Sequence, residues 1–329
     1  MIPFEGFPHV IESQQFSRQF VEELFQVAEA MRKHPQAYAK TLDGVVVCVD
    51  FGEVSTRTFK SFDIGAKRLG AIVSGTQAMD KLSSVVKGES FADTVRTIDS
   101  YEPNFLVMRW PVEGSLAQAA ALVHPRCSVI NAGDGPGQHP TQALLDLYTI
   151  WRQFRSFDRP IVVGMVGDLQ RGRTVHSLTY LMAKVFPQIS FVFISPESCK
   201  MKPEIIGYLD RHHRHFIEVT KPKLYELAEA VDVLYMTRPQ LNLEPDVSVQ
   251  EQLRREYREF ILTAEIADRM KSEAIILHPL PRNEEIQPEV DQNPRARYFE
   301  QAGNGMWIRM ALLERIHHAR TGRGMSIPG

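Results

Sequence analysis

The stretch GVVVCVDFGEVSTRTFKSF, residues 44–62, joins a strand pattern to a helix pattern. An apolar run from Val45 to Phe51 breaks at Gly52, and the polar segment Ser55–Thr58 follows it. Beyond that segment, apolar side chains recur at helical spacing, at Phe59, Phe62, Ala66 and Leu69. A buried strand that passes directly into a helix is the repeating unit of parallel α/β sheets, so this stretch predicts the fold class.

Two series of strand and helix patterns run along the chain. Apolar runs predict strands at 45–51, 71–75, 105–110 and 128–133, and then at 161–168, 190–198, 231–238 and 273–280. Helical patterns lie at 14–33, 139–154, 174–185, 221–230, 264–270 and 305–320, and the most loop-like segment is 238–250. We therefore expect an α/β protein with two doubly wound domains, each a mainly parallel sheet flanked by helices.

The composition argues against several classes of protein. Of the 329 residues, 43% are hydrophobic, which is enough for large cores. The 38 basic and 40 acidic side chains nearly cancel, so we expect neither nucleic acid nor a membrane as a partner. We expect no leader peptide and no membrane helix, because no apolar run approaches about 18 residues. Three scattered cysteines, Cys48, Cys127 and Cys199, predict a cytoplasmic protein without disulfides.

Arginine recurs where the predicted strands end. The four are Arg57, Arg109, Arg173 and Arg238, two in each series. In open α/β sheets ligands bind beyond the carboxyl ends of the strands, and the guanidinium fork matches phosphate and carboxylate oxygens. The sequence therefore predicts a ligand with several negative charges, bound in a cleft between the two domains.

The segment Ser55–Thr58 opens the first of these helices. A helix N-terminus favours an anion through its free N–H groups and its dipole. An ordinary helix cap needs only one hydroxyl, whereas three hydroxyls and Arg57 stand together here. We interpret the segment as an anion site.

The segment GDLQRGRT, residues 167–174, leaves an alternative open. It follows a strand pattern and differs from the phosphate loop GxxxxGK[ST] by Arg173 in place of lysine, so an NTPase is a rival interpretation. Against it, no other strand pattern ends in a clear magnesium-binding aspartate. The histidines of RHHRH, residues 211–215, lie in a polar segment without partners at ligand spacing. We interpret them as a solvated helix end and predict no metal site.

Eight segments together resemble the aspartate carbamoyltransferases, in the same order and over nearly the whole chain. They are STRT (55–58), SSVVKGES (83–90), MR (108–109), NAGDGPGQHPTQALLDLYTI (131–150), GDLQRGRTVHSL (167–178), LYMTRPQ (234–240), HPLPRNEEI (278–286) and YFEQAGNGMWIRMALL (298–313). The HPLPR segment is similar to the aspartate branch, since ornithine carbamoyltransferases usually carry a cysteine where Pro279 stands.

The resemblance implies transfer of the carbamoyl group from carbamoyl phosphate to the amine of L-aspartate, a step of pyrimidine biosynthesis that needs no cofactor. It implies a carbamoyl-phosphate-binding domain formed by residues 1–143 with the C-terminal helix 303–329, and an aspartate-binding domain formed by residues 144–302. It also implies a homotrimer with active sites shared between subunits, and it leaves open a larger assembly with regulatory or dihydroorotase chains.

The resemblance further assigns roles to single residues. The carbamoyl-phosphate contacts are Ser55, Thr56, Arg57, Thr58, Arg109, His139, Gln142, Pro279 and Leu280. The aspartate contacts are Lys87, Arg173, Arg238 and Gln240, and Ser83 and Lys87 belong to a loop that reaches the neighbouring subunit's site. The catalytic group is Arg57, Thr58, Lys87, Arg109 and His139, which would polarise the carbonyl and hold the leaving phosphate.

Three places depart from the family pattern. Phe59 stands where arginine or a small polar residue is usual, and Trp110 replaces a histidine. The segment TRPQLNLEPD, residues 237–246, contains Pro239 and lacks the usual acidic residue, for which Glu244 is a candidate substitute. Two alternatives therefore stay open, a carbamoyltransferase for a different amine and a non-catalytic homologue that binds anions.

Overall fold

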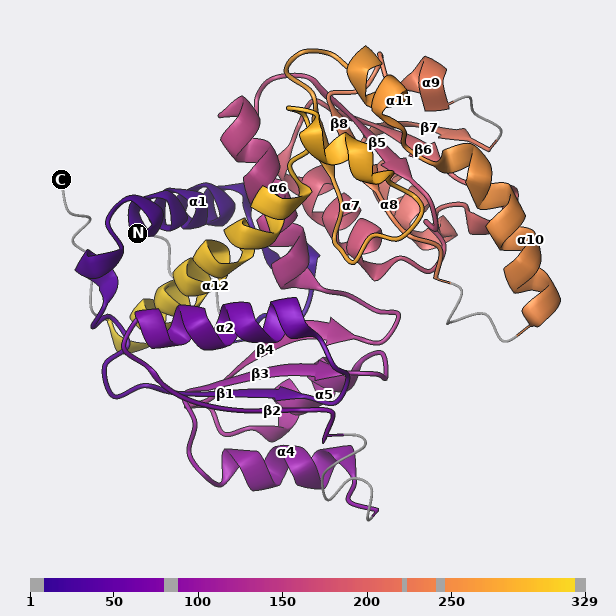
Figure 1. Ribbon diagram of the computed structural model, residues 1–329. Helices are drawn as coiled ribbons and strands as arrows, with labels where there is room; N and C mark the ends of the chain where they lie inside the picture. Colours follow the sequence, from indigo (N-terminus) through magenta and orange to yellow (C-terminus); the bar gives the residue numbers. More distant parts are fainter. Residues whose placement is uncertain (1–8, 80–87, 221–223, 241–245, 323–329) are drawn as a thin grey trace. The chain divides into compact units, whose positions relative to one another are not determined.

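The computed structural model describes residues 9–79, 88–220, 224–240 and 246–322 (Figure 1). The chain forms two compact units, Met1–Leu144 with Gly303–Gly329, and Leu145–Ala302. Each unit is built on one parallel sheet flanked by helices, which confirms the predicted fold class. Short 3₁₀ turns lie at Ser13–Gln15, Pro35–Tyr38, Glu197–Cys199, Arg258–Phe260 and Pro288–Gln292.

The first unit has a four-stranded parallel sheet with strand order β2-β1-β3-β4. Its strands are β1 (Val46–Phe51), β2 (Ile72–Gln77), β3 (Phe105–Trp110) and β4 (Ser128–Asp134). Its helices are α1 (Arg18–Lys33), α2 (Thr56–Arg68), α4 (Phe91–Asp99), α5 (Ser115–Leu122) and most of α12 (Tyr298–Thr321). The direction in which strands are added reverses between β1 and β3, so this is the switch point where a ligand is expected.

Side chains alternate between the two faces of this sheet. On one face Phe51 of β1 meets Phe59 of α2, with ring centroids 5.5 Å apart. On the other face Trp110 of β3 packs in a cluster with Val95 of α4. Helices α2 and α4 accordingly lie on opposite sides of the sheet (Figure 1). Because neighbours in a strand point to opposite faces, Arg109 shares the α2 side and Trp110 the α4 side.

The second unit has a five-stranded parallel sheet with strand order β7-β6-β5-β8-β9, and its switch point lies between β5 and β8. The strands are β5 (Ile161–Val166), β6 (Ile189–Ile194), β7 (His215–Val219), β8 (Val233–Met236) and β9 (Ile275–Leu277). The helices are α6 (Pro140–Phe154), whose first residues belong to the first unit, α7 (Arg173–Val185), α8 (Pro203–Arg211), α9 (Leu224–Leu227), α10 (Val247–Tyr257) and α11 (Ala264–Arg269). No helix in the described part of the chain has the length and apolar character needed to cross a membrane.

Several elements differ from the sequence-based expectation, and helices α4 and α5 lie where no helix was expected. Helix α8 does end within the RHHRH segment, at Arg211, but β7 begins at His215, where no strand was predicted. This strand lies at the sheet edge and has no buried residue, so it lacks the apolar run of a central strand. Residues 247–250 of the predicted loop instead begin α10, because Asp246 caps it by accepting the Ser248 N–H at 2.8 Å. Of the helix predicted at 221–230, residues 224–227 are helical and 221–223 lie outside the described residues.

Candidate active site

The N-terminus of α2 lies at the switch point of the first sheet. Within the described chain the Ser55 side chain does not cap the helix, and the Ser55 backbone N–H donates to Gln77 Oε1 at 3.1 Å. Thr58 is buried in the first turn, whereas Arg57 is exposed. The Ser55 side chain therefore does not satisfy the N–H groups of the first turn, which can be offered to an anion.

Arg109 is the last residue but one of β3 and lies on the face that α2 covers. Its Nη2 forms an ion pair with Glu53 Oε2 at 2.8 Å, and its Nη1 lies 3.5 Å from the Ala132 carbonyl oxygen. The Arg109 side chain is 14% exposed and that of Glu53 is 34% exposed. An anion that binds Arg109 must therefore share it with Glu53 or displace Glu53, which the sequence did not single out.

A tight turn follows β4. The Gln138 N–H donates to Asp134 Oδ1 at 2.6 Å. Gly135 has a φ of +51°, and a Cβ added there would lie 2.3 Å from the Pro111 carbonyl oxygen. Because this position excludes a side chain, the turn requires glycine and places the next residues at the carboxyl edge of the sheet.

His139 and Gln142 come from this turn and the first turn of α6. Both are buried, with exposures of 4% and 9%. The His139 Nδ1 lies 3.4 Å from the Thr141 hydroxyl, and the His139 carbonyl accepts the Gln142 N–H at 2.9 Å. A buried imidazole at a strand end has the position and chemistry of a group that polarises a carbonyl.

The two aromatic departures pack into the core of the first unit. A Cβ added at Gly52 would lie 2.7 Å from the Trp110 ring, and one added at Gly75 would lie 2.8 Å from the Phe59 ring. Each large ring is therefore matched by a glycine on the facing backbone. Trp110 points away from the side of Arg109, so it fills the core and does not line the same face as that guanidinium.

At the switch point of the second sheet, the loops after β5 and β8 are held together. Gly167 has a φ of +121°, and an added Cβ would lie 2.4 Å from the Thr237 carbonyl oxygen. Asp168 is 1% exposed and accepts the Arg171 N–H at 3.0 Å and the Gln240 N–H at 3.2 Å, one on each oxygen. Burial raises the pKa of the Asp168 carboxyl, and these hydrogen bonds and the Arg171 guanidinium oppose that rise.

These two loops carry Arg173, Arg238 and Gln240. Arg173 is the first residue of α7, directly after the N-cap Gly172. Arg238 lies two residues beyond the end of β8, and both arginines are half-buried. Two guanidinium groups and an amide thus come to one sheet edge, a set that suits a ligand with two carboxylates.

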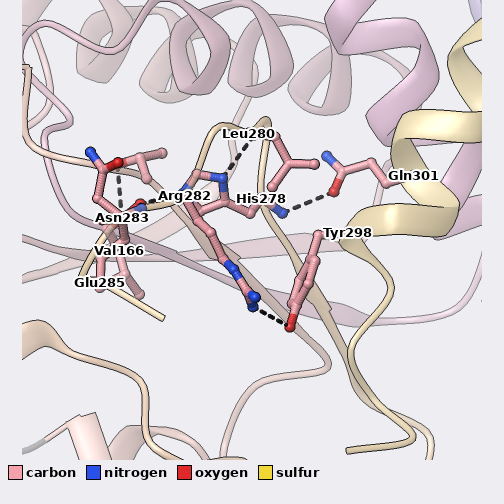
Figure 2. Close-up of polar contacts among 9 residues, drawn as sticks. Val166, His278, Leu280, Arg282, Asn283, Glu285, Tyr298 and Gln301 are labelled. Atoms are coloured by element: carbon pink, nitrogen blue, oxygen red, sulfur yellow. Dashed lines mark hydrogen bonds and ion pairs between the residues drawn. The ribbon is translucent and has the colours of Figure 1, made fainter. Parts of the chain in front are cut away.

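Pro279 and Leu280 form the turn beyond β9. Leu280 has a φ of +53°, which is uncommon for a residue other than glycine. Its N–H donates to His278 Nδ1 at 2.8 Å, and His278 Nε2 lies 2.9 Å from Glu285 Oε1 (Figure 2). His278 and Glu285 are buried, so the turn is held from inside the unit.

The predicted site residues thus divide between the units. The first unit holds Ser55, Thr56, Arg57, Thr58, Arg109, His139 and Gln142, and the second holds Arg173, Arg238, Gln240, Pro279 and Leu280. Ser83, Lys87 and Glu244 lie outside the described residues. Sequence reasoning missed the acidic residues that hold these groups in place, namely Glu53, Asp134, Asp168 and Glu285. Asp134, Asp168 and Glu285 stand inside quoted motifs, but an acidic residue in a sequence gives no sign of its distant partner.

The fold defines an α/β protein with cationic side chains at the switch point of each of two parallel sheets, an arrangement that suits negatively charged ligands. Residues 8–152 match the family model described as the aspartate/ornithine carbamoyltransferase carbamoyl-P binding domain, and residues 160–316 match the Asp/Orn binding domain of the same family. The chain belongs to the aspartate/ornithine carbamoyltransferase family. The GDLQRGRT segment is therefore a motif of this family and not the phosphate loop of an NTPase.

Individual relatives belong to the aspartate branch. The chain is 44% identical over 308 residues to the chloroplastic aspartate carbamoyltransferase of Arabidopsis thaliana, and the match covers 93% of this chain and 76% of that protein. It is 35% identical to the Trypanosoma cruzi aspartate transcarbamoylase solved with N-(phosphonacetyl)-L-aspartic acid, with a TM-score of 0.86 over 93% of this chain and 95% of that one. The M. jannaschii catalytic subunit is 36% identical, with a TM-score of 0.84 over 96% and 100%.

Proposed function

We propose that the chain is an aspartate carbamoyltransferase, which transfers the carbamoyl group of carbamoyl phosphate to the amine of L-aspartate. The products are N-carbamoyl-L-aspartate and phosphate, in pyrimidine biosynthesis. The observation that carries the proposal is the presence of cationic and polar side chains at the switch points of both sheets. One substrate brings a phosphate and the other two carboxylates, so each sheet edge has a matching ligand.

Carbamoyl phosphate binds through the first unit. Its phosphate meets the first turn of α2, where Ser55, Thr56, Arg57 and Thr58 supply N–H groups, hydroxyls and a guanidinium. The helix dipole adds to this attraction. The carbamoyl group is held by a second set, Arg109, His139 and Gln142, together with the backbone of Pro279 and Leu280.

Aspartate binds through the second unit. Arg173 and Arg238 hold its two carboxylates, and Gln240 adds an amide. The shared carboxylate of Asp168 supports this role, because it fixes the backbone of Gln240 against the loop that precedes Arg173.

The chemistry is acyl transfer by positioning. The aspartate amine attacks the carbonyl carbon, and the C–O bond to phosphate breaks as the new C–N bond forms. Arg109, His139 and Thr58 stabilise the oxyanion, while Arg57 and Lys87 hold the leaving phosphate. Bringing two substrates together in one geometry supplies much of the rate enhancement. A phosphate oxygen accepts the amine proton, so the site works without a carboxylate base.

Assembly and location follow from the same proposal. We expect a homotrimer in which Ser83 and Lys87 complete the site of a neighbouring copy, open to regulatory or dihydroorotase chains. The three cysteines are buried free thiols, which suits a reducing cytoplasm. Sedimentation with and without carbamoyl phosphate measures the oligomeric state, and an active monomer would remove the shared-site proposal.

A second candidate function is carbamoyl transfer to a different amine. It is favoured by Pro239, which stands between Arg238 and Gln240 in the segment that departs from the family pattern. Proline fixes its own φ and biases the preceding residue toward extended backbone, so it changes how the Arg238 guanidinium is presented.

A ureido-product assay tests both candidates. The purified chain is given carbamoyl phosphate with L-aspartate, ornithine, putrescine, 2,3-diaminopropionate or no amine. Product with aspartate alone supports the first proposal, and product with another amine supports the second. No product with any amine, together with retained binding of carbamoyl phosphate, would favour an anion-binding homologue.

The phosphate subsite has its own test. Arg57→Ala is expected to weaken the binding of inorganic phosphate by about tenfold, the loss of one charge-assisted contact. Lys60→Ala is the matched control, because it removes a positive charge from an exposed position on the same helix. Equal phosphate affinity of the two variants would contradict the role given to Arg57.

A further inference from the structure

His278 is the centre of a buried polar network in the second unit (Figure 2). Its Nδ1 accepts the Leu280 N–H at 2.8 Å, so the ring proton must reside on Nε2. Nε2 then donates to Glu285 Oε1 at 2.9 Å, and the same oxygen accepts the Asn283 N–H at 3.0 Å. Glu285 thereby fixes both the tautomer and the orientation of the imidazole.

The network continues from the His278 backbone into the core. The His278 N–H donates to Gln301 Oε1 at 2.9 Å (Figure 2), and Gln301 Nε2 donates to Asp146 Oδ1 at 2.5 Å. The Tyr235 hydroxyl donates to the other Asp146 oxygen at 2.7 Å. The side chains of Gln301, Asp146 and Tyr235 are all fully buried or nearly so.

The hydrogen bond of the Leu280 N–H also sets the direction of the Pro279 carbonyl. The peptide that joins these residues is planar and trans, so its C=O points opposite to its N–H. The N–H faces the His278 ring, and the Pro279 carbonyl is therefore directed away from it. Among the described residues no donor occupies that carbonyl. The left-handed φ of Leu280 is a conformation that persists where the surroundings hold it.

We propose that Glu285 and Gln301 are positioning residues, which hold the Pro279 carbonyl where it accepts an N–H of the carbamoyl group. This inference rests on the proposed function. The network joins the turn to the buried side chains of Asp146 and Tyr235, so the core of the second unit holds the turn in place. The carbonyl is then oriented before the substrate arrives, which lowers the cost of reaching the reactive geometry.

A network of this kind can also act on stability alone, and two substitutions at His278 separate these roles. In His278→Asn the side-chain carbonyl can still accept the N–H two residues on, as in an Asx turn, whereas His278→Ala leaves that N–H without an acceptor. We expect His278→Ala to lower kcat about 100-fold, because the Pro279 carbonyl is no longer held in position against the carbamoyl group. KM for aspartate should stay within about threefold of the wild-type value. His278→Asn should recover most of that kcat.

Tyr298→Phe is the matched control in the same unit. It removes a hydroxyl that accepts from Arg282 at 2.9 Å and contacts Asp291, outside the His278 network (Figure 2). We expect a loss of stability with kcat unchanged. Glu285→Gln tests geometry against charge, because one amide oxygen can accept both bonds that now reach Oε1; kcat should stay within about threefold.

The outcomes separate this inference from the proposed function. No carbamoyl product from the wild-type chain would defeat the proposed function. An active wild type with a folded His278→Ala variant of equal kcat would overturn the positioning role alone, as would a kcat loss in Tyr298→Phe equal to that of His278→Ala. If His278→Ala does not fold, Gln301→Leu takes its place, with an expected kcat loss of about tenfold. An unchanged kcat would again overturn the proposal.

Discussion

Asp168→Asn tests how the second unit holds its aspartate contacts. In the native protein the two carboxylate oxygens divide two backbone donors, the Arg171 N–H at 3.0 Å and the Gln240 N–H at 3.2 Å. Asparagine keeps the volume of the side chain but has only one carbonyl oxygen. One of the two N–H groups must then face an NH₂ group, so a hydrogen bond is replaced by two opposed donors.

The magnitude follows from the loss of one hydrogen bond to a charged acceptor, worth about 1.5–3 kcal/mol. If the Gln240 N–H loses its acceptor, the segment beyond β8 is no longer held in its binding geometry. About 2 kcal/mol taken from that geometry corresponds to a rise of roughly 30-fold in KM for aspartate. Global stability should fall by less, because removing a buried charge offsets part of the cost.

The assay combines steady-state kinetics with urea unfolding, and Asp232→Asn is the control. Asp232 accepts the Val162 N–H at 2.8 Å and pairs with Lys271 Nζ at 2.8 Å, at the amino ends of the strands of the same sheet. Its loss should lower stability and leave KM for aspartate unchanged. A wild-type KM in Asp168→Asn, or an equal rise in Asp232→Asn, would refute the role given to Asp168.

Three further predictions concern the first unit. Trp110→His should lower the free energy of unfolding by about 3 kcal/mol, since it empties a packed site, and urea denaturation measures this. Because Trp110 points away from Arg109, the KM of the Trp110→His variant for carbamoyl phosphate should stay within about threefold of the wild-type value. Glu53→Gln should tighten carbamoyl phosphate binding by up to about fivefold at low salt, because Arg109 is released from a part-exposed ion pair. Calorimetry measures this affinity, and weaker binding would mean that Glu53 orients Arg109. Burial raises the pKa of Glu314 to about 7, above its value in the unfolded chain. The folded state therefore binds more protons, and the free energy of unfolding should fall as pH rises from about 4.5 to 7. Glu314→Gln should reduce this slope, and the remainder below about pH 6 comes from Asp50, whose pKa burial raises to about 6.

The fold was largely predictable because the central strands are buried on both faces. The sequences of β1, β5 and β8 are nearly continuous apolar runs, and these runs mark where the helices between them begin and end. β7 was missed because it is an exposed edge strand with polar letters. The start of α10 was missed because its signal is the Asp246 cap, which resembles a turn residue until the helix is seen.

The cations of the candidate site were predictable from their positions, and the groups that hold them were not. Arg57, Arg109 and Arg173 lie at or just after strand ends, where ligands of open α/β sheets bind. The hydrogen bond from Gln240 to Asp168 joins residues 72 positions apart, so no local pattern reports it. Glu53 gave no signal for a different reason: it looks like an ordinary surface acid until β1 and β3 bring it to Arg109.

The departures from the family pattern do not all bear on function in the same way. Phe59 and Trp110 are each accommodated by a glycine on the facing backbone, so both are absorbed in the core of the first unit. Pro239 stands between two expected aspartate contacts, offers no N–H, and biases Arg238 toward extended backbone. A change of specificity would therefore arise at the acceptor and not at carbamoyl phosphate. The panel of amines tests this directly: turnover with aspartate alone would show that Arg238 still reaches its carboxylate, and turnover with another amine would trace the change to residues 238–240.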